Sequence, residues 1–558
     1  MKTILRKSAK ITGIAIGGIL LLLFLLPILF PNTVAGPIKK WTNQSIEGEL
    51  NFSKIQLSFF RHFPSLTLTL YDFSLTGSEP FAKDTLIAGK AISFGIDVAS
   101  VFGDSIEVNK FFIEDAFINI QVDEKGNANY NVYKGKESAG SDSSNTRLKI
   151  EGIFIKNSRL IYNDRSMPMR IDAIGFNYEG RGDLTNDQFD LQSHLSADRF
   201  DFAFDGTTYM QRKNVKADLI TGINTSSLEF RFAKNDLLIN KLPVDFTGSM
   251  AILKEGYDID LKVISGTTDF GNLFSALPPE YDSWFADTKF SGQSQIRVDM
   301  KGSYRAKTSQ APDFSVRLWV HDGMISHKDA PAPLQHFWVN STLLVPGLNT
   351  DSTTIVIDTL KFELDGAPTH ATLFVKGIET PYVKANVNSS IDLELLDRAL
   401  GLTIADLKGQ LRLQGSANGY YRSDTVIHSI PTYHMDAGII NGYFKYRDLP
   451  MAVEQVNAQI KSDCATGKLQ DVGLVIDQFN AAIGNGQVTG DFAVKGLVKS
   501  NVKGSMKANL QLEDLAKAIP FEGYTFGGRF IANLHTEGRM DLDKEIMPAT
   551  NGTLQITN

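Results

Sequence analysis

Alternation of apolar and polar residues runs through most of the chain after residue 46, and it restricts the fold to sheets built from half-buried strands. The pattern is clear at residues 65–70, where three leucines alternate with serine and threonine, which predicts one buried and one wet face. After Leu70 the phase slips by one residue, so we expect a strand, a bend and a second short strand. The leucines of this first run are Leu66, Leu68 and Leu70.

Later runs repeat the alternation, and each ends at a glycine typical of a turn. Parallel strands that are covered on both faces read as continuous apolar runs, so the pattern favours antiparallel strands with one buried face. The fold class predicted is therefore mainly β, an elongated antiparallel sheet with a few short helices. The apolar members of these later runs are Phe200, Phe202, Phe204, Ile296, Val298, Met300, Phe362, Leu364, Leu411 and Leu413.

Such an apolar face must be covered, because apolar surface left in water costs roughly 25 cal/mol per Å². The candidate helices are too few and too short to cover it. A second sheet would give sandwich-like domains. Alternatively, the sheet curls lengthwise into a trough whose inner face holds lipid acyl chains. Both arrangements predict nearly the same alternation, so the pattern leaves both open.

Short helical segments recur along the chain and indicate an internal repeat. Residues 270–277, 393–400 and 512–519 each follow a strand pattern, and their last residues are offset by 123 and 119 positions. A glycine that opens a similar downstream segment recurs at offsets of 115 and 114. Two markers with nearly one period favour a stacked architecture of several strands per repeat. The glycines are Gly323, Gly438 and Gly552.

The N-terminus predicts a membrane anchor. Residues 11–30 contain no charge and are long enough to cross the hydrocarbon core as a helix. Four basic residues precede the segment and only two follow it closely, which predicts a cytoplasmic N-terminus and places the remaining chain across the membrane. A signal peptide cleaved before Gly36 is the alternative, although the apolar stretch is longer than the usual core of such a peptide.

These features predict the following organisation. Residues 1–10 are the cytoplasmic N-terminus, 11–30 the anchor, and 31–146 a first β region with a flexible loop at 135–145. Three sheet segments follow at 147–322, 323–437 and 438–551, and 552–558 begin a further one, so we expect the protein to continue beyond Asn558.

Composition and motifs argue against several classes of function. The net charge is −7 and no run of five basic residues occurs, so we expect no nucleic-acid partner. Cys464 is the only cysteine, which excludes an internal disulfide and a multi-thiolate metal site. The histidines that lie closest together, His321, His327 and His336, fall in a polar segment that reads as a solvated loop. We therefore predict no catalytic residue, no cofactor and no metal, and a protein that is not an enzyme.

Two stretches carry a family resemblance. Residues 57–102, "LSFFRHFPSLTLTLYDFSLTGSEPFAKDTLIAGKAISFGIDVASVF", and 118–133, "INIQVDEKGNANYNVY", together with the anchor, resemble the start of AsmA-family proteins of the Bacteroidota type. The downstream strand, helix and strand units resemble the AsmA-like C-terminal region. The resemblance implies an inner-membrane-anchored periplasmic protein of outer-membrane assembly. Larger relatives resemble bridge-like lipid-transfer proteins, whose β-groove is lined by apolar side chains.

Two functions follow as expectations. The first is a β-groove that carries phospholipid towards the outer membrane, with acyl chains sliding along the apolar residues named above. The second is an assembly factor that binds outer-membrane proteins or their insertion machinery, for example by strand addition at a sheet edge.

Overall fold

The computed structural model describes residues 47–557 except 64, 103–105, 133–145, 167, 205, 254, 282–284, 306–307, 329, 331, 365, 401–404, 424–427, 498, 520–526 and 542–543. The anchor predicted at 11–30 and the loop predicted at 135–145 lie outside the described residues. Within the described part of the chain, no helix is both long enough and apolar enough to cross a membrane. The prediction of a mainly β fold with few helices is confirmed.

The chain divides into two compact units. Unit 1 comprises Met1–Val263 and Phe274–Trp284, and unit 2 comprises Ile264–Leu273 and Phe285–Asn558. Each unit is described by itself below.

Unit 1 is built from long paired strands. Almost all neighbours are antiparallel, but β5 and β6 run parallel, which the alternation did not predict. Strands β1 and β2 both pair with β3, and β3 to β11 then pair in chain order. The elements are β1 (Leu50–Asn51), β2 (Lys54–His62), β3 (Ser65–Thr76), β4 (Thr85–Ile96), η1 (Ala99–Phe102), β5 (Ile106–Val122), β6 (Thr146–Asp164), β7 (Met169–Arg181), β8 (Gln188–Phe204), β9 (Thr207–Asn224), β10 (Glu229–Ile239), β11 (Leu242–Leu253), β12 (Gly256–Ser265, whose last two residues belong to unit 2) and η2 (Pro279–Tyr281).

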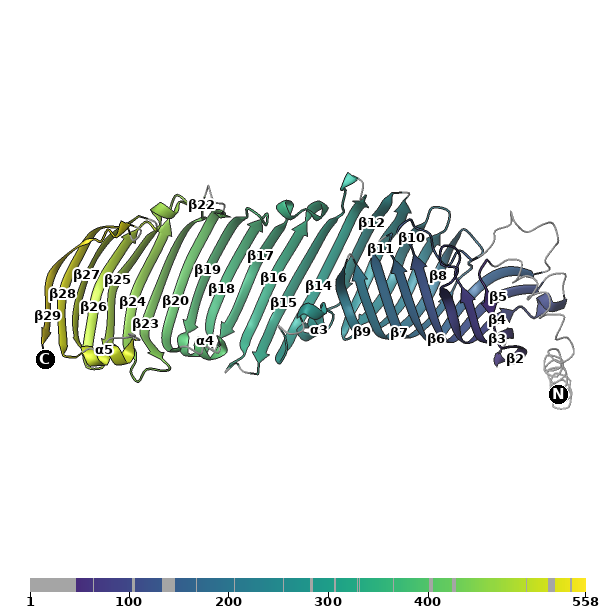
Figure 1. Ribbon diagram of the computed structural model, residues 1–558, viewed down its shortest axis with the longest axis horizontal. Coiled ribbons are helices and arrows are strands. Elements are labelled where there is room, and N and C mark those ends of the chain that lie inside the picture. The colour runs from purple at the N-terminus through teal and green to yellow at the C-terminus, as the bar shows by residue number, and fades with distance from the viewer. Residues whose placement is uncertain are drawn as a thin grey trace, which may run out of the picture. The chain divides into compact units, whose positions relative to one another are not determined.

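Unit 2 is a sheet of antiparallel strands that pair in chain order, with short α-helices at one end of the strands (Figure 1). The elements are β13 (Thr268–Asp269), α3 (Phe270–Phe274), β14 (Thr288–Tyr304), β15 (Asp313–His327), β16 (Leu334–Val345), η4 (Pro346–Leu348), η5 (Thr350–Ser352), β17 (Thr354–Leu364), β18 (Ala367–Lys376), β19 (Tyr382–Asp392), α4 (Leu393–Leu400), β20 (Ala405–Tyr420), β21 (Arg422–Ser423), β22 (His428–Ser429), β23 (Thr432–Tyr446), β24 (Val453–Cys464), η6 (Leu469–Asp471), β25 (Gly473–Ile483), β26 (Gly486–Lys495), β27 (Ser500–Gln511), α5 (Leu512–Ala518), β28 (Arg529–Met540) and β29 (Ala549–Thr557). Among the strands that the structure describes here, β21 and β22 form a separate two-stranded ribbon.

The three helices begin where the sequence predicts, but α3 ends at Phe274 and not at 277, α5 ends at Ala518 and not at 519, and the glycine marker is misaligned. Strands β14 to β19 separate α3 from α4, and β20 and β23 to β27 separate α4 from α5. Gly323 lies opposite Gly292, whose φ is 113°, and the matching pair in the next repeat is Gly442 opposite Gly409, whose φ is 109°. Gly442, not Gly438, is therefore the counterpart of Gly323. The segment boundaries drawn at Gly323 and Gly438, 322/323 and 437/438, fall inside β15 and β23, and of these two glycines Gly323 lies at a bulge.

Bulges bend the strands of both units and explain the phase slips in the sequence. In unit 2 the register shifts at four consecutive pairs from β14/β15 to β17/β18, and again from β20/β23 to β25/β26. Left-handed residues lie in strands of both units, and two of them donate the backbone N–H to an asparagine of the neighbouring strand: Asn157 (φ 48°) to the Asn177 side chain (3.0 Å) and Asn441 (φ 50°) to the Asn457 side chain (2.9 Å). A bulge adds a residue and bends the strand, so the apolar set stays on one face while its phase changes.

The slip after Leu70 has a different outcome from the one expected. The structure has one strand, β3, over the whole of Ser65–Thr76, and not two strands joined by a bend. Asp72 at the slip is left-handed with φ 48°, yet the pairing of β3 with β4 passes through it without a shift. The pairing holds the strand together across a residue that the sequence alone marks as a break.

Candidate functional site

One face of the unit 2 sheet collects the apolar residues of every main strand. Directly paired residues share a face, so the pairing can be followed from strand to strand. Val298 of β14 pairs with Val316, which pairs with Leu343 and then Ile355. Further along, Phe362 pairs with Thr369, Thr369 with Ser389, and Ser389 with Leu413. The predicted lining residues that lie on this apolar face are Ile296, Val298, Met300, Phe362, Leu364, Leu411 and Leu413.

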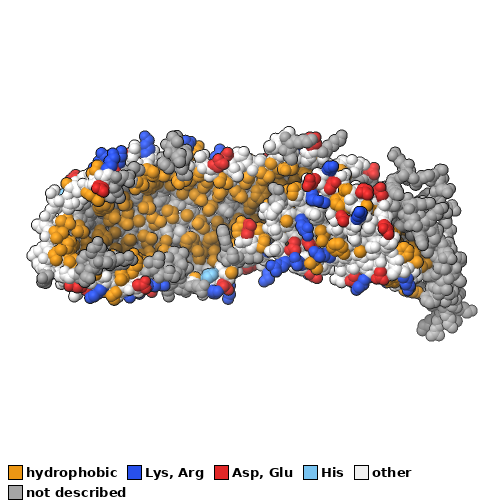
Figure 2. All heavy atoms as spheres, in the orientation of Figure 1, with side chains coloured by type: hydrophobic (Ala, Val, Ile, Leu, Met, Phe, Trp, Pro, Cys, Tyr) orange, Lys and Arg blue, Asp and Glu red, His pale blue; other side chains and the backbone are white. Residues whose placement is uncertain are grey.

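The apolar face of unit 2 is hollowed and only partly covered. Hydrophobic side chains line the hollow over β14 to β28 (Figure 2). All seven predicted lining residues on it are half-buried, being neither sealed in a core nor fully exposed. Apart from β21 and β22, the described strands of unit 2 belong to a single sheet, so among them no second sheet packs on this face. The sandwich arrangement left open by the sequence is therefore not the one observed here.

Short helices cover one edge of the apolar face. The ring of Phe270 in α3 meets Phe290 edge-on at 5.5 Å between centroids and stacks on Phe337 at 5.8 Å. In α5, Leu515 and Ala518 pack in a cluster with residues of β25, β27 and β28, among them Leu510. The helices seal an edge and leave the rest of the hollow open.

The first predicted lining residues lie elsewhere, in a closed core of unit 1. Leu66 and Leu68 are each 1 % exposed and Leu70 is 5 % exposed. Leu66 and Leu68 pack with Phe59 and with residues of β4 and β5, so protein side chains cover this leucine face. We therefore leave Leu66, Leu68 and Leu70 out of the candidate lining.

The alternation predicted that the face opposite these leucines is exposed to water. In the structure that face is buried. Thr67 is fully buried and Thr69 is 1 % exposed. Burial is tolerated because each hydroxyl has a partner: Thr67 donates to the Ser58 carbonyl (3.0 Å), and Thr69 pairs with the Ser93 hydroxyl (2.8 Å).

The three phenylalanines of β8 are intermediate between these cases. Phe200 packs at the margin of a small core around Ala173 and Ala197, whereas Phe204 is 38 % exposed. Phe202 pairs with Ile171 and is half-buried. The exposure of this row rises from Phe200 to Phe204, so part of unit 1 also presents apolar surface.

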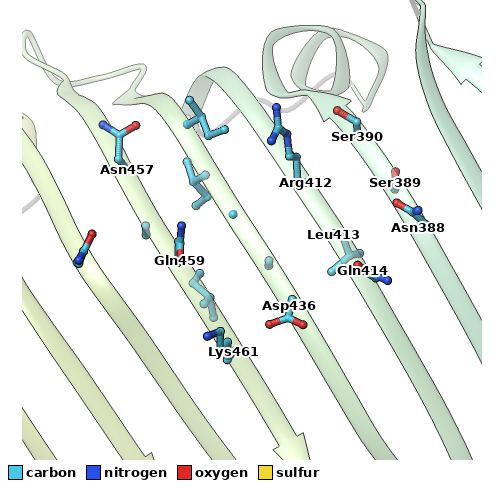
Figure 3. A pocket seen from close by; sticks show the side chains of 17 residues that line it. Asn388, Ser389, Ser390, Arg412, Leu413, Gln414, Asp436, Asn457, Gln459 and Lys461 are labelled. Carbon is cyan, nitrogen blue, oxygen red and sulfur yellow. The ribbon is translucent and has the colours of Figure 1, made fainter.

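The opposite face of the unit 2 sheet is polar and contains a shallow hollow of about 540 Å³. Figure 3 shows Arg412, Gln414, Asp436, Gln459 and Lys461 projecting from β20, β23 and β24 along this outer face. No motif in the sequence singles out these residues, although they are the polar members of the same alternation that marks Leu411 and Leu413 as apolar.

The titratable groups do not form a metal-binding cluster in the described part of the chain. No group of three or more His, Cys, Asp or Glu side chains is placed there to hold a metal ion. His321 and His327 lie in β15 and His336 in β16, so the solvated loop predicted for them is wrong. The pKa of His336 is raised, chiefly by its hydrogen bond with Asp322 (2.9 Å) and then by the charge of Glu363. Cys464 is buried, and its thiol bonds to the Lys468 carbonyl.

Comparison with known proteins identifies the N-terminal part of the chain. The AsmA family matches residues 5–179, and the resemblance predicted from the sequence is confirmed over that range. No curated protein and no solved structure matches the chain.

Proposed function

With residues 5–179 assigned to the AsmA family, we propose that the chain is a lipid-binding β-groove that carries phospholipid along the apolar face of unit 2. The observation that carries the proposal is the half-buried apolar face, which no second sheet covers among the described strands. An exposed apolar surface of this extent marks a binding site. Acyl chains fit it because each buried methylene gains about 0.8 kcal/mol without a directional contact.

The mechanism is passive. Acyl chains lie on the side chains of β14 to β28, while headgroups remain in water at the open side. Such binding requires no individual side chain and no catalytic group, so the protein acts without being an enzyme. Travel along the face needs only that neighbouring strands present similar apolar side chains, as the row that starts at Val298 does.

The experiment compares two adjacent residues of β20 that face opposite ways. Phospholipid extracted from the purified full-length protein is quantified for the wild type, Leu413→Asp and Arg412→Asp. Leu413→Asp places a charge on the apolar face and should lose most of the bound phospholipid, whereas Arg412→Asp changes the outer face and should retain it. Equal lipid content in the two variants, or no lipid in the wild type, contradicts the proposal.

The location follows from the same proposal. Residues 11–30 anchor the protein in the inner membrane, with the N-terminus in the cytoplasm and the β-units in the periplasm, on the way to the outer membrane. A topology reporter fused after Asn558 should be active only in the periplasm and remain with inner-membrane fractions. Release of a soluble form cleaved near Ala35 contradicts the anchor.

The same purified protein distinguishes the alternative function, an assembly factor for outer-membrane proteins, from the lipid groove. A protein that retains a specific protein partner and contains no extractable phospholipid supports the assembly factor and not the groove.

A further inference from the structure

The polar face of unit 2, opposite the proposed groove, carries a straight row of side chains across six strands. Residues that pair directly lie about 5 Å apart between Cβ atoms and project from the same face. The pairing runs without interruption from β16 to β23. We call this the outer row, and its members are Trp338, Lys361, His370, Asn388, Gln414 and Asp436.

An aromatic cluster forms one end of the outer row. The His321 ring lies between two tryptophans, with centroid distances of 4.5 Å to Trp319 and 4.4 Å to Trp338. The Trp319 indole N–H donates to the Gln295 side chain (3.0 Å). Trp338 nevertheless remains 41 % exposed. An indole held in place by its neighbours but open to water offers an apolar ring face to a ligand, at little entropic cost.

The outer row crosses a hollow of about 620 Å³ whose lining is rich in groups that both donate and accept hydrogen bonds. The lining includes Thr359, Thr372, Asn386 and Ser416 beside the row. The hollow shown in Figure 3 adjoins it and shares Asn388, Gln414 and Asp436. Amides and hydroxyls of this kind match a ligand that presents many hydroxyl groups.

The charges along the row narrow the class of ligand. Lys361 and Asp436 carry opposite charges and stand within one row, and Asp358 adds a second carboxylate to the hollow. Arg412 and Lys461 of the adjoining hollow add positive charges beside these carboxylates, so the surface carries both signs and offers neither a polyanion nor a polycation a surface of one charge. A ligand of low charge with hydroxyl groups at its edges and C–H groups on its ring faces meets both the amide lining and the indole.

We propose that the outer row and the Trp319–His321–Trp338 cluster form a binding site for an uncharged oligosaccharide. An extended glycan lies across the strands. One of its sugar rings stacks on Trp338, and hydroxyl groups of other rings bond to Asn388 and Gln414. The site uses the face opposite the lipid groove, so the same β-sheet holds lipid on one side and glycan on the other. The proposal does not depend on lipid transport.

The test measures binding by the purified full-length protein in a detergent without a sugar headgroup. Cellohexaose, chitohexaose and maltohexaose are titrated by calorimetry, and contacts are mapped by saturation-transfer NMR. At least one should bind, and Trp338→Ala should weaken that binding about tenfold, as expected for the loss of one stacking contact worth about 1.4 kcal/mol. Asn388→Ala and Gln414→Ala should each weaken it about fivefold through one lost hydrogen bond.

Controls separate this site from folding and from the lipid groove. Asn533→Ala changes an exposed amide on the outer face of β28, away from the row, and should bind as the wild type does. The variants Asn388→Ala and Gln414→Ala alter exposed side chains and should keep the fold. They therefore test the site even if Trp338→Ala does not fold. Absence of binding to all three oligosaccharides overturns the proposal, as does binding that all three row variants leave unchanged. Phospholipid content should stay constant across the row variants, so loss of lipid transport and loss of this site are distinguishable.

Discussion

Leu68 in unit 1 and Leu413 in unit 2 lie in strands with the same alternation, but their surroundings differ. Leu68 is 1 % exposed and packs in a core with Phe59 and Val108, whereas Leu413 is half-buried on a face that no second sheet of described strands covers. The leucine patterns are alike, so the difference arises from the chain around them. Alternation determines that a strand has an apolar face, and the neighbouring segments determine whether protein or a ligand covers it.

The cover of the Leu68 region comes from sequence-local connections. Val98, just after β4, and Val101, in η1, pack against the core of Leu66 and Leu68, and the start of β5 adds Ile106. In unit 2 the helices α3 and α5 follow strands directly and reach only the edge of the sheet. Connections that fold over a face close it, and connections that remain at the edge leave it open.

The largest expected effect is the loss of stability when a charged side chain replaces each of these two leucines. Leu68→Asp buries a carboxylate without a partner and should cost about 4 kcal/mol of unfolding free energy. Leu413→Asp should cost less than about 1 kcal/mol, because water reaches its half-open face. Thermal unfolding of both variants, followed by circular dichroism, measures the difference. Equal losses mean that the face of Leu413 is as closed as the core of Leu68.

Hydroxyl pairs provide a finer comparison. Thr69 and Ser93 pair in unit 1 (2.8 Å), and Thr369 and Ser389 pair in unit 2 (2.6 Å). Ser93→Ala leaves the Thr69 hydroxyl in the closed core without this hydrogen-bond partner and should lower the free energy of unfolding by about 2 kcal/mol. Thr369 and Ser389 are 7 % and 5 % exposed, against 1 % for each of Thr69 and Ser93, so Ser389→Ala should cost less, about 1 kcal/mol. Urea titration of the two variants gives the values, and a larger loss for Ser389→Ala reverses the assignment of open and closed regions.

The bend of the open sheet can be weakened without changing its apolar face. The Asn457 side chain accepts a hydrogen bond from the backbone N–H of Asn441, which is left-handed. Removal of the Asn457 side chain leaves this N–H at the bulge without that partner. Asn457→Ala should lower the unfolding free energy by about 1 kcal/mol and reduce phospholipid content, because a flatter sheet holds acyl chains less closely. Unchanged lipid content at reduced stability limits the role of this bulge to folding.

The smallest effect concerns pH and unit 1. The pKa of Asp172 is lowered, chiefly because its carboxylate accepts hydrogen bonds from Arg159 (3.0 and 2.8 Å). A carboxyl group whose folded-state pKa is depressed stabilises the fold above its ordinary value of 3.8, and this contribution is lost as the pH falls through the folded-state pKa. Acid should therefore weaken unit 1 below about pH 4.

Asp172→Asn serves as the matched variant for this effect. It cannot titrate, so its stability should depend less on pH in the acid range than that of the wild type. Parallel pH profiles for the two proteins would show that the Arg159 pair contributes nothing measurable, as is found for many ion pairs at protein surfaces.

Much of the architecture follows from the sequence by itself. The period-2 runs predict the strands, and because the side-chain period in a strand is two, they also place Phe362 on the same face as Leu364, and Leu411 on the same face as Leu413. The short apolar helices at 270, 393 and 512 are predicted because their pattern departs from that period. Each of these features depends on residues close together in the chain.

Tertiary structure decided the rest, because it depends on contacts between distant segments. Burial of Thr67, the parallel pairing of β5 with β6, and the alignment of Gly323 with Gly442 all depend on which strands come together. The outer row has the same origin: Trp338 and Asp436 are far apart in sequence, and only the pairing of six strands aligns them. Local alternation sets the polarity of each face, whereas strand register and the path of the connections determine what each face can bind.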